Sequence, residues 1–276
     1  MSNNITLSAS ISQNLYSLQT TQKLIDQTSY RLSTGKKVNS ALDDPMAYFT
    51  ASEHTQRASD LQVRKDEMSE AVQTIEAANN GIEGIIDLIS SAKSLAQSAL
   101  SSDSATDRAD YMSQFNAVLD QIDDMAADAG YKGVNLLDAA STLDVSFDET
   151  GTSKITLTGK NCDSSGLSLV DATAWGTVDA AGNTAINASI ALLDTAKSTL
   201  RANSKALSNQ LNTITTRQDF TTKMINTLTA GSANLVNADT NEEGANLITL
   251  QTQQSLATNS LSIAAQSSQA VLGLFS

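Results

Sequence analysis

Few of the side chains that commonly catalyse reactions or bind metals occur in this sequence. His54 is the only histidine and Cys162 the only cysteine. A helical zinc site of the His-Glu-x-x-His type needs two histidines, and a thiol cluster or internal disulfide needs a second cysteine. A hydrolase triad is not supported either, because no Gly-x-Ser-x-Gly elbow occurs and Cys162 lies far from His54 in a loop-like stretch. We therefore expect no catalytic residues and no enzymatic activity.

Acidic residues and glycines are the remaining candidates for ligand chemistry. Asp43-Asp44, Asp123-Asp124 and Asp239 lack the alternating oxygen-ligand spacing of a calcium loop, so helix caps and solvated helix faces explain them better. Gly81-Ile82-Glu83-Gly84 follows no expected strand, which a phosphate-binding loop requires. The sequence predicts neither a metal site nor a cofactor.

Charge and hydropathy restrict the partners of the chain. Its 276 residues include 30 acidic and 17 basic side chains, a formal net charge of −13. This excess of negative charge disfavours nucleic acids and anionic membranes. No apolar run long enough to span a bilayer occurs, and the first residues lack the basic start and apolar run of a secretory signal peptide. We expect no nucleic-acid partner, no membrane insertion and no conventional secretion signal.

The elements that could position these residues are long helices. Aromatic residues make up only 4% of the chain and there is one proline, a composition typical of narrow helical packing. Seven-residue repeats, in alternating steps of four and three, predict a helix seam near each end of the chain. The N-terminal seam is Ile11, Leu15, Leu18, Gln22, Ile25, Ser29 and Leu32, and the C-terminal seam is Leu247, Leu250, Gln254, Ala257, Leu261, Ala264, Ser268, Val271 and Phe275.

Three inner stretches show the same repeat. They run from Leu61 to Ile89, from Tyr111 to Met125 and from Ile186 to Leu228, the last a helix of some forty residues. Between them, alternation through Leu143, Val145 and Phe147, a turn at 148–151 and alternation through Ile155 and Leu157 predict a β-hairpin. From about Cys162 to Asn183 the residues are small and polar around Trp175, which indicates a loop-rich surface patch.

The C-terminal segment is unusual because residues 244–276 contain no charged side chain. A solvent-exposed helix normally carries charge on its wet face, so this segment is expected to become largely enclosed. The few apolar seam residues of the N-terminal segment are too little burial to offset the entropy of ordering its backbone. We therefore expect both ends to be flexible in the monomer and to fold when copies assemble.

Three runs of residues resemble the bacterial flagellin family. The first is Arg31-Leu32-Ser33-Thr34-Gly35 through Asn39-Ser40-Ala41 to Asp43-Asp44, in which Gly35 suits a left-handed helix cap and Asp44-Pro45 an N-cap and first turn. The second is Asn234 to Asp239 with Glu242-Glu243 and the uncharged end. The third is Gly130-Tyr131-Lys132-Gly133-Val134-Asn135-Leu136-Leu137. The matches cover about residues 5–140 and 183–276, and the middle resembles nothing specific.

The resemblance implies a mainly α fold: a long antiparallel coiled-coil rod with a small β-hairpin region at its outer tip and terminal helices paired in an inner domain. Residues 1–44 and 233–276 would form the inner polymerisation core, 45–140 and 183–232 the helical rod, and 141–182 the variable region. The expected assembly interface is Ile11, Leu15, Leu18, Ile25, Arg31, Leu32, Gly35, Asn39, Asp43, Asp44, Leu247, Leu250, Ala257, Leu261, Ala264, Val271 and Phe275.

The implied function is that of a subunit of the extracellular flagellar filament. Its partners would be copies of itself, the flagellar export apparatus, an export chaperone, the filament cap and hook-junction proteins. Pro45-Met46-Ala47 stands where flagellins more often have Ala-Ala-Gly, and Asp-Asp-Pro is also typical of the hook-filament junction protein, which remains an alternative. Heptads alone would also suit a secreted coiled-coil binding protein.

Overall fold

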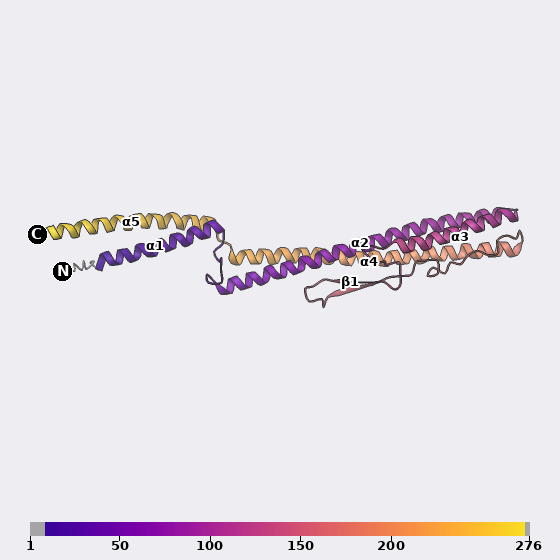
Figure 1. Cartoon of the computed structure of the whole chain (residues 1–276), viewed down its shortest axis with the longest axis horizontal. Coiled ribbons are helices and arrows are strands. Elements are labelled where there is room, and N and C mark those ends of the chain that lie inside the picture. The colour runs from indigo at the N-terminus through magenta and orange to yellow at the C-terminus, as the bar shows by residue number, and fades with distance from the viewer. Residues whose placement is uncertain (1–8, 274–276) are drawn as a thin grey trace. The chain divides into compact units, whose positions relative to one another are not determined.

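The structure, a computed structural model that describes residues 9–273, is mainly α-helical (Figure 1). Its elements are α1 (Ala9–Thr34), α2 (Pro45–Ser101), α3 (Ala105–Asp128), β1 (Thr142–Ser146), β2 (Lys154–Thr158), α4 (Ala180–Val236) and α5 (Thr240–Gly273). This confirms the predicted fold class, mainly α with a small antiparallel hairpin. Among residues 9–273, no helix combines the length and apolar character needed to cross a membrane.

The chain divides into two compact units. We call Met1–Gln56 with Thr227–Ser276 the terminal unit and Arg57–Asn226 the central unit. The terminal unit contains α1 and α5, the first turns of α2 and the last turns of α4.

The helix boundaries of the terminal unit follow the expected capping chemistry. Gly35 has φ +69° directly after α1, where a residue without a Cβ atom adopts the left-handed conformation without strain. The Asp44 carboxylate accepts a hydrogen bond from the Ala47 amide at 3.0 Å, and Pro45 is the first residue of α2. Asp239 caps α5 in the same manner through the Asn241 amide at 2.8 Å. These caps explain why the chain turns at residues 35–44 and 237–239.

In the central unit, α2, α3 and α4 run alongside one another and share one apolar core (Figure 1). The predicted repeats supply much of it, with Ile75, Ile82 and Ile89 of α2 fully buried. Alanines at intervening positions of α2 are buried as well, and they allow the neighbouring helices to approach closely. The core residues from α3 and α4 include Phe115, Leu119, Ile122, Ile186, Leu193, Leu200 and Ile214.

The hairpin forms as predicted, but it does not lie at the tip. Antiparallel pairing sets Val145 opposite Ile155, and Val145 is buried on the face that packs against the core. The turn, however, is held beside the first residues of the central unit. The Glu149 carboxylate lies 2.7 Å from the Arg57 guanidinium of α2, and Arg217 of α4 lies over the ring of Phe147. The apolar face of the hairpin therefore packs along the helices, which explains why the hairpin cannot project from their end.

The segment between β2 and α4 was expected to be a surface patch, and this prediction was wrong. It has no long element of regular structure, yet Cys162, Leu167 and Trp175 are buried in the core of the central unit. The Trp175 ring packs 4.7 Å from the Phe115 ring, centroid to centroid. The Asn116 side chain of α3 both donates to the Ala172 carbonyl (3.1 Å) and accepts from the Ala172 amide (2.8 Å). The segment is thus a fixed part of the core.

Candidate assembly interface

The two terminal helices pack against each other in antiparallel orientation. The side-chain oxygen of Gln22 in α1 accepts a hydrogen bond from the side-chain amide of Gln254 at 2.5 Å, and Arg31 forms an ion pair of 3.3 Å with Glu243 at the start of α5. Contact between the helices continues along their length (Figure 1). Glu243 is 8% exposed, so this ion pair is shielded from solvent more than a typical surface pair.

On α5, the described positions of the predicted seam are the ones that turn toward α1. Leu247, Leu250, Gln254, Ala257, Leu261 and Ala264 are all half-buried, whereas the residues between them are exposed. Val271 lies within α5, where the structure does not describe its side chain, and Phe275 lies outside the described residues.

On α1, the structure corrects part of the predicted seam. Ile11, Leu18, Ile25 and Leu32 are half-buried, but Leu15 is 39% exposed. The most buried positions are Thr21 and Thr28, 8% and 7% exposed, in place of the predicted Gln22 and Ser29. Starting the heptad from Ile11 with a step of three instead of four would have identified both threonines. The predicted seam takes the step of four because it places Leu15 in the seam, and leucine is the more usual seam residue.

Apolar side chains also lie on the outer side of α5, away from α1. Ile248, Leu256 and Ile263 are each more than 60% exposed and fall on the helix face opposite the seam. We call these three residues the outer stripe. A heptad seam describes only one apolar face of a helix, so the predicted seam does not include these residues. The absence of charge from residues 244–276 is the sequence signal that points to a second face.

The loops next to this helix pair bind each other through their backbones. The Val236 carbonyl accepts hydrogen bonds from the amides of Lys37 (2.8 Å) and Val38 (3.2 Å), and the Ala238 amide donates to the Gly35 carbonyl (2.9 Å). Gly35 therefore contributes in two ways, through the left-handed conformation that follows α1 and through a backbone carbonyl that accepts this hydrogen bond. The signature residues consequently have defined roles inside the chain.

Within the first loop, Asp43 organises the backbone. Its carboxylate accepts hydrogen bonds from the amides of Asn39 (3.0 Å) and Ser40 (2.9 Å), and the Asn39 side chain donates to the Lys36 carbonyl (3.0 Å). The backbone hydrogen bonds from Ser40 and Asn39 lower the pKa of Asp43 below its ordinary value. Leu42 beside it is 95% exposed, so the loop displays an apolar side chain on a rigid support.

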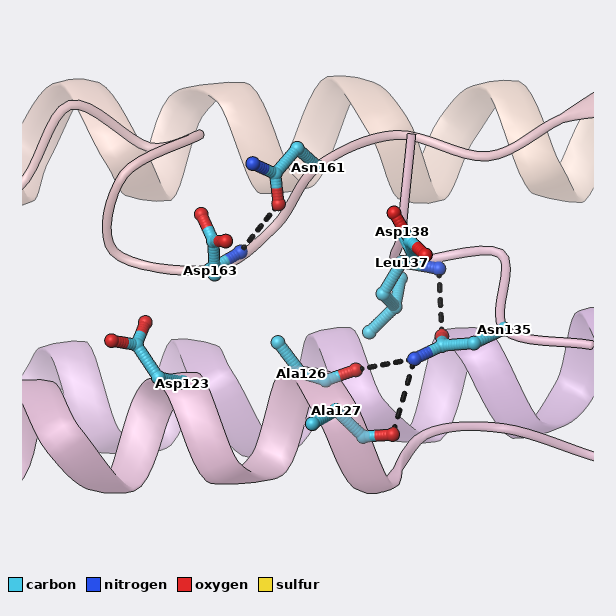
Figure 2. Close-up of a pocket in the computed structure, with 8 residues that line it drawn as sticks. All are labelled: Asp123, Ala126, Ala127, Asn135, Leu137, Asp138, Asn161 and Asp163. Carbon is cyan, nitrogen blue, oxygen red and sulfur yellow. Dashed lines mark hydrogen bonds between the residues drawn. The ribbon is translucent and has the colours of Figure 1, made fainter. Parts of the chain in front are cut away.

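The third signature run, at 130–137, closes a different site in the central unit (Figure 2). The Asn135 side chain donates to the carbonyls of Ala126 (2.7 Å) and Ala127 (3.2 Å) at the end of α3, and it accepts from the Leu137 amide (2.9 Å). It therefore caps the last turn of α3 and fixes the following turn.

A cavity of about 450 Å³ lies beside this turn and is lined by polar residues that include Asp123, Asp138 and Asp163 (Figure 2). Asp123 accepts hydrogen bonds from the Ser164 amide and hydroxyl, and Asp163 accepts one from the Gly166 amide. These carboxylates thus hold loops in place. Over the described part of the chain, no group of three or more His, Cys, Asp or Glu side chains is arranged to hold a metal ion.

The sequence of the chain is similar to those of known flagellins. The model of the bacterial flagellin N-terminal helical region matches residues 5–142. Flagellin FljM of Caulobacter vibrioides is 33% identical over 95% of this chain and 94% of its own length, and flagellin FljK of the same organism is 31% identical over 99% and 98%. The crystal structure of Bacillus cereus flagellin covers 56% of this chain and 88% of its own, with a TM-score of 0.46 and 18% identity.

Proposed function

The chain belongs to the bacterial flagellin family, and on this premise we propose that the outer stripe of α5 and the exposed residues beside the helix pair form the polymerisation interface between copies. Flagellins are the subunits of the extracellular bacterial flagellar filament. The chain is accordingly a structural protein and not an enzyme, and it works by associating with copies of itself.

The observation that carries the proposal is the outer stripe. One side of α5 packs on α1, while Ile248, Leu256 and Ile263 on the other side remain more than 60% exposed. A helix with two apolar faces and no charge after Gly244 is stable only where both faces are covered. Burial of each such side chain contributes about 1.5–3 kcal/mol. In a filament, a neighbouring copy can bury the outer stripe of every subunit.

The division of labour along the chain follows from the same proposal. We assign residues 1–44 and 233–276 to the polymerisation core, 45–140 and 183–232 to the helical layer around it, and 141–182 to the variable region. The charge-free character of 244–276 supports the first assignment. The seams between α2, α3 and α4 support the second, because these helices bury a core of their own.

The remaining partners of the proposal follow from assembly outside the cell. We propose that the chain is exported unfolded through the flagellar export apparatus with an export chaperone. It then meets hook-junction proteins and folds beneath the filament cap. Terminal helices whose seam is only half-buried within the chain suit a subunit that stays unfolded until neighbouring copies cover it.

A pair of matched substitutions tests the interface. Leu256 and Val170 are 62% and 63% exposed, the first on α5 and the second in the loop segment of the central unit. We predict that Leu256→Asp abolishes polymerisation of the purified chain, measured by sedimentation and electron microscopy, because it places a charge in the contact between copies. Val170→Asp adds the same charge at equal exposure and leaves polymerisation unchanged. Normal filaments from Leu256→Asp subunits would exclude the outer stripe from the interface.

A further inference from the structure

The central unit carries opposite charges on two of its helices. Between Asp194 and Asp219, α4 contains four basic residues and no acidic one, in a chain whose net charge is −13. Helix α3 contains six aspartates and a single arginine, Arg108, which is buried. The charge of this unit is therefore separated by helix, and a uniform acidic surface would not produce this pattern.

The basic residues of α4 that matter here follow one line along the helix. Lys197, Arg201 and Lys205 recur every fourth position, which places them on the same side of the helix. Arg201 and Lys205 are exposed, and Lys197 is half-buried with its ammonium group 3.1 Å from the Ser90 hydroxyl. The preceding Asp194 is neutralised by Lys93 at 2.6 Å. We call Lys197, Arg201 and Lys205 the basic strip.

The acidic residues of α3 lie on the side opposite its buried residues. We call this set the acidic face, and it consists of Asp107, Asp110, Asp120, Asp124 and Asp128, all exposed. In the part of the chain that the structure describes, the ion pairs use neither the basic strip nor the acidic face. Each copy thus presents one unpaired surface of each sign.

We propose that the basic strip of one copy docks against the acidic face of α3 on a neighbouring copy in the filament. The inference rests on the proposed function and adds a contact between central units to it. When two different surfaces of neighbouring copies meet head to tail, the contact is heterologous. Such a contact builds an open helical assembly wherever the rotation between copies does not close a ring. Complementary charge also selects the orientation in which subunits add, because like charges face each other in most wrong orientations.

Charge reversal and its compensation test this contact. One full-length variant carries Lys197→Glu, Arg201→Glu and Lys205→Glu, a second carries Asp120→Lys, Asp124→Lys and Asp128→Lys, and a third carries all six. Five of the six side chains are exposed and only Lys197 is half-buried, so helix content by circular dichroism and the melting temperature of the monomer should stay close to those of the native chain. We expect the critical concentration for polymerisation to rise on the order of tenfold or more in either triple variant, because like charges then face each other.

The six-fold variant has the native net charge with the two signs exchanged, and it should polymerise at close to the native critical concentration. Triple variants that polymerise like the native chain would overturn the proposed docking, and so would a six-fold variant that fails as badly as the triple ones. Either result leaves the terminal interface intact, since native subunits still polymerise. A native chain that forms no filament overturns the proposed function and this inference with it.

Discussion

The carboxylate of Asp43 shows how one exposed side chain fixes a whole loop. It accepts hydrogen bonds from the backbone amides of Asn39 and Ser40, and a third from the Ser40 hydroxyl at 3.2 Å. Next to this loop, the Gly35 and Lys37 backbones form hydrogen bonds with Ala238 and with Val236, the last residue of α4. The position of the terminal helices relative to this loop pair therefore depends on a few hydrogen bonds to charged or backbone oxygens.

This arrangement predicts a pH dependence of the loop. Hydrogen bonds to the charged form lower the folded pKa of Asp43 below its ordinary value of 3.8, so the unfolded loop binds a proton more readily than the folded loop. The contribution of Asp43 is present in full above that ordinary value and is lost as the pH falls through the folded pKa. Amide hydrogen exchange at Asn39 and Ser40, after correction for intrinsic rates, should show protection that decreases at acid pH.

The matched control is Asp43→Asn, which keeps the shape of the side chain but cannot ionise. Its loop amides should exchange faster at neutral pH and should lose the acid-dependent step. The same acid-dependent loss of protection in Asp43→Asn would assign the effect to another group.

Some residues of this site could be predicted from local sequence and others could not. The cap at Gly35 and the Asp44-Pro45 start of α2 depend on neighbouring residues alone, and both predictions are confirmed. Thr21 and Thr28 were missed because a threonine is ambiguous between a seam and a surface position. Only the partner helix decides between them, since its packing covers the threonine methyl group.

At the scale of elements, the seven-residue repeats predicted each of the five segments that form helices within residues 9–273. A repeat of this length that continues over many turns is compatible with a helix and not with a strand. The segment at 159–179 could not be predicted. Its buried residues Leu167, Leu169 and Trp175 have no regular spacing. Their burial depends on contacts with other elements, such as that of the Trp175 ring with Phe115 of α3, which no local pattern in the segment describes.

The approach of α3 to α2 depends on two small positions of α2, and they are not equivalent. A Cβ atom on Gly81 would lie 2.6 Å from the Cβ of Ala129, whereas one on Gly84 would meet the flexible thioether of Met125. We predict that Gly81→Ala destabilises the central unit by about 1–3 kcal/mol, because neither atom of the clash can rotate away.

Gly84→Ala is the matched control on the same helix face. Met125 can adopt another rotamer, and alanine is the better helix former by about 1 kcal/mol, so its effect should stay within about 1 kcal/mol of the native chain. Urea unfolding followed by circular dichroism measures both. Equal losses of free energy of unfolding in the two variants would show that α3 is not held at this distance by Gly81.

At the scale of the whole molecule, the two compact units differ in how their apolar residues are covered. The central unit encloses residues such as Met68, Ile122 and Leu193 within the chain. In the terminal unit the seam is only half-buried, and the outer stripe is exposed. A structure of this kind is complete in one part and requires neighbours in the other, which agrees with a subunit whose function is to polymerise.

The central claim is that the terminal helices are covered by neighbouring copies, and limited proteolysis before and after polymerisation tests it most directly. Chymotrypsin is the suitable protease, because Tyr16 and Tyr30 on α1 and Leu256 on α5 are exposed cleavage sites, whereas residues 244–276 offer no site to trypsin. Monomers should lose both ends rapidly and leave a fragment that contains the central unit, and the same sites should resist cleavage in filaments. Terminal helices that resist the protease equally in monomer and filament would contradict the account.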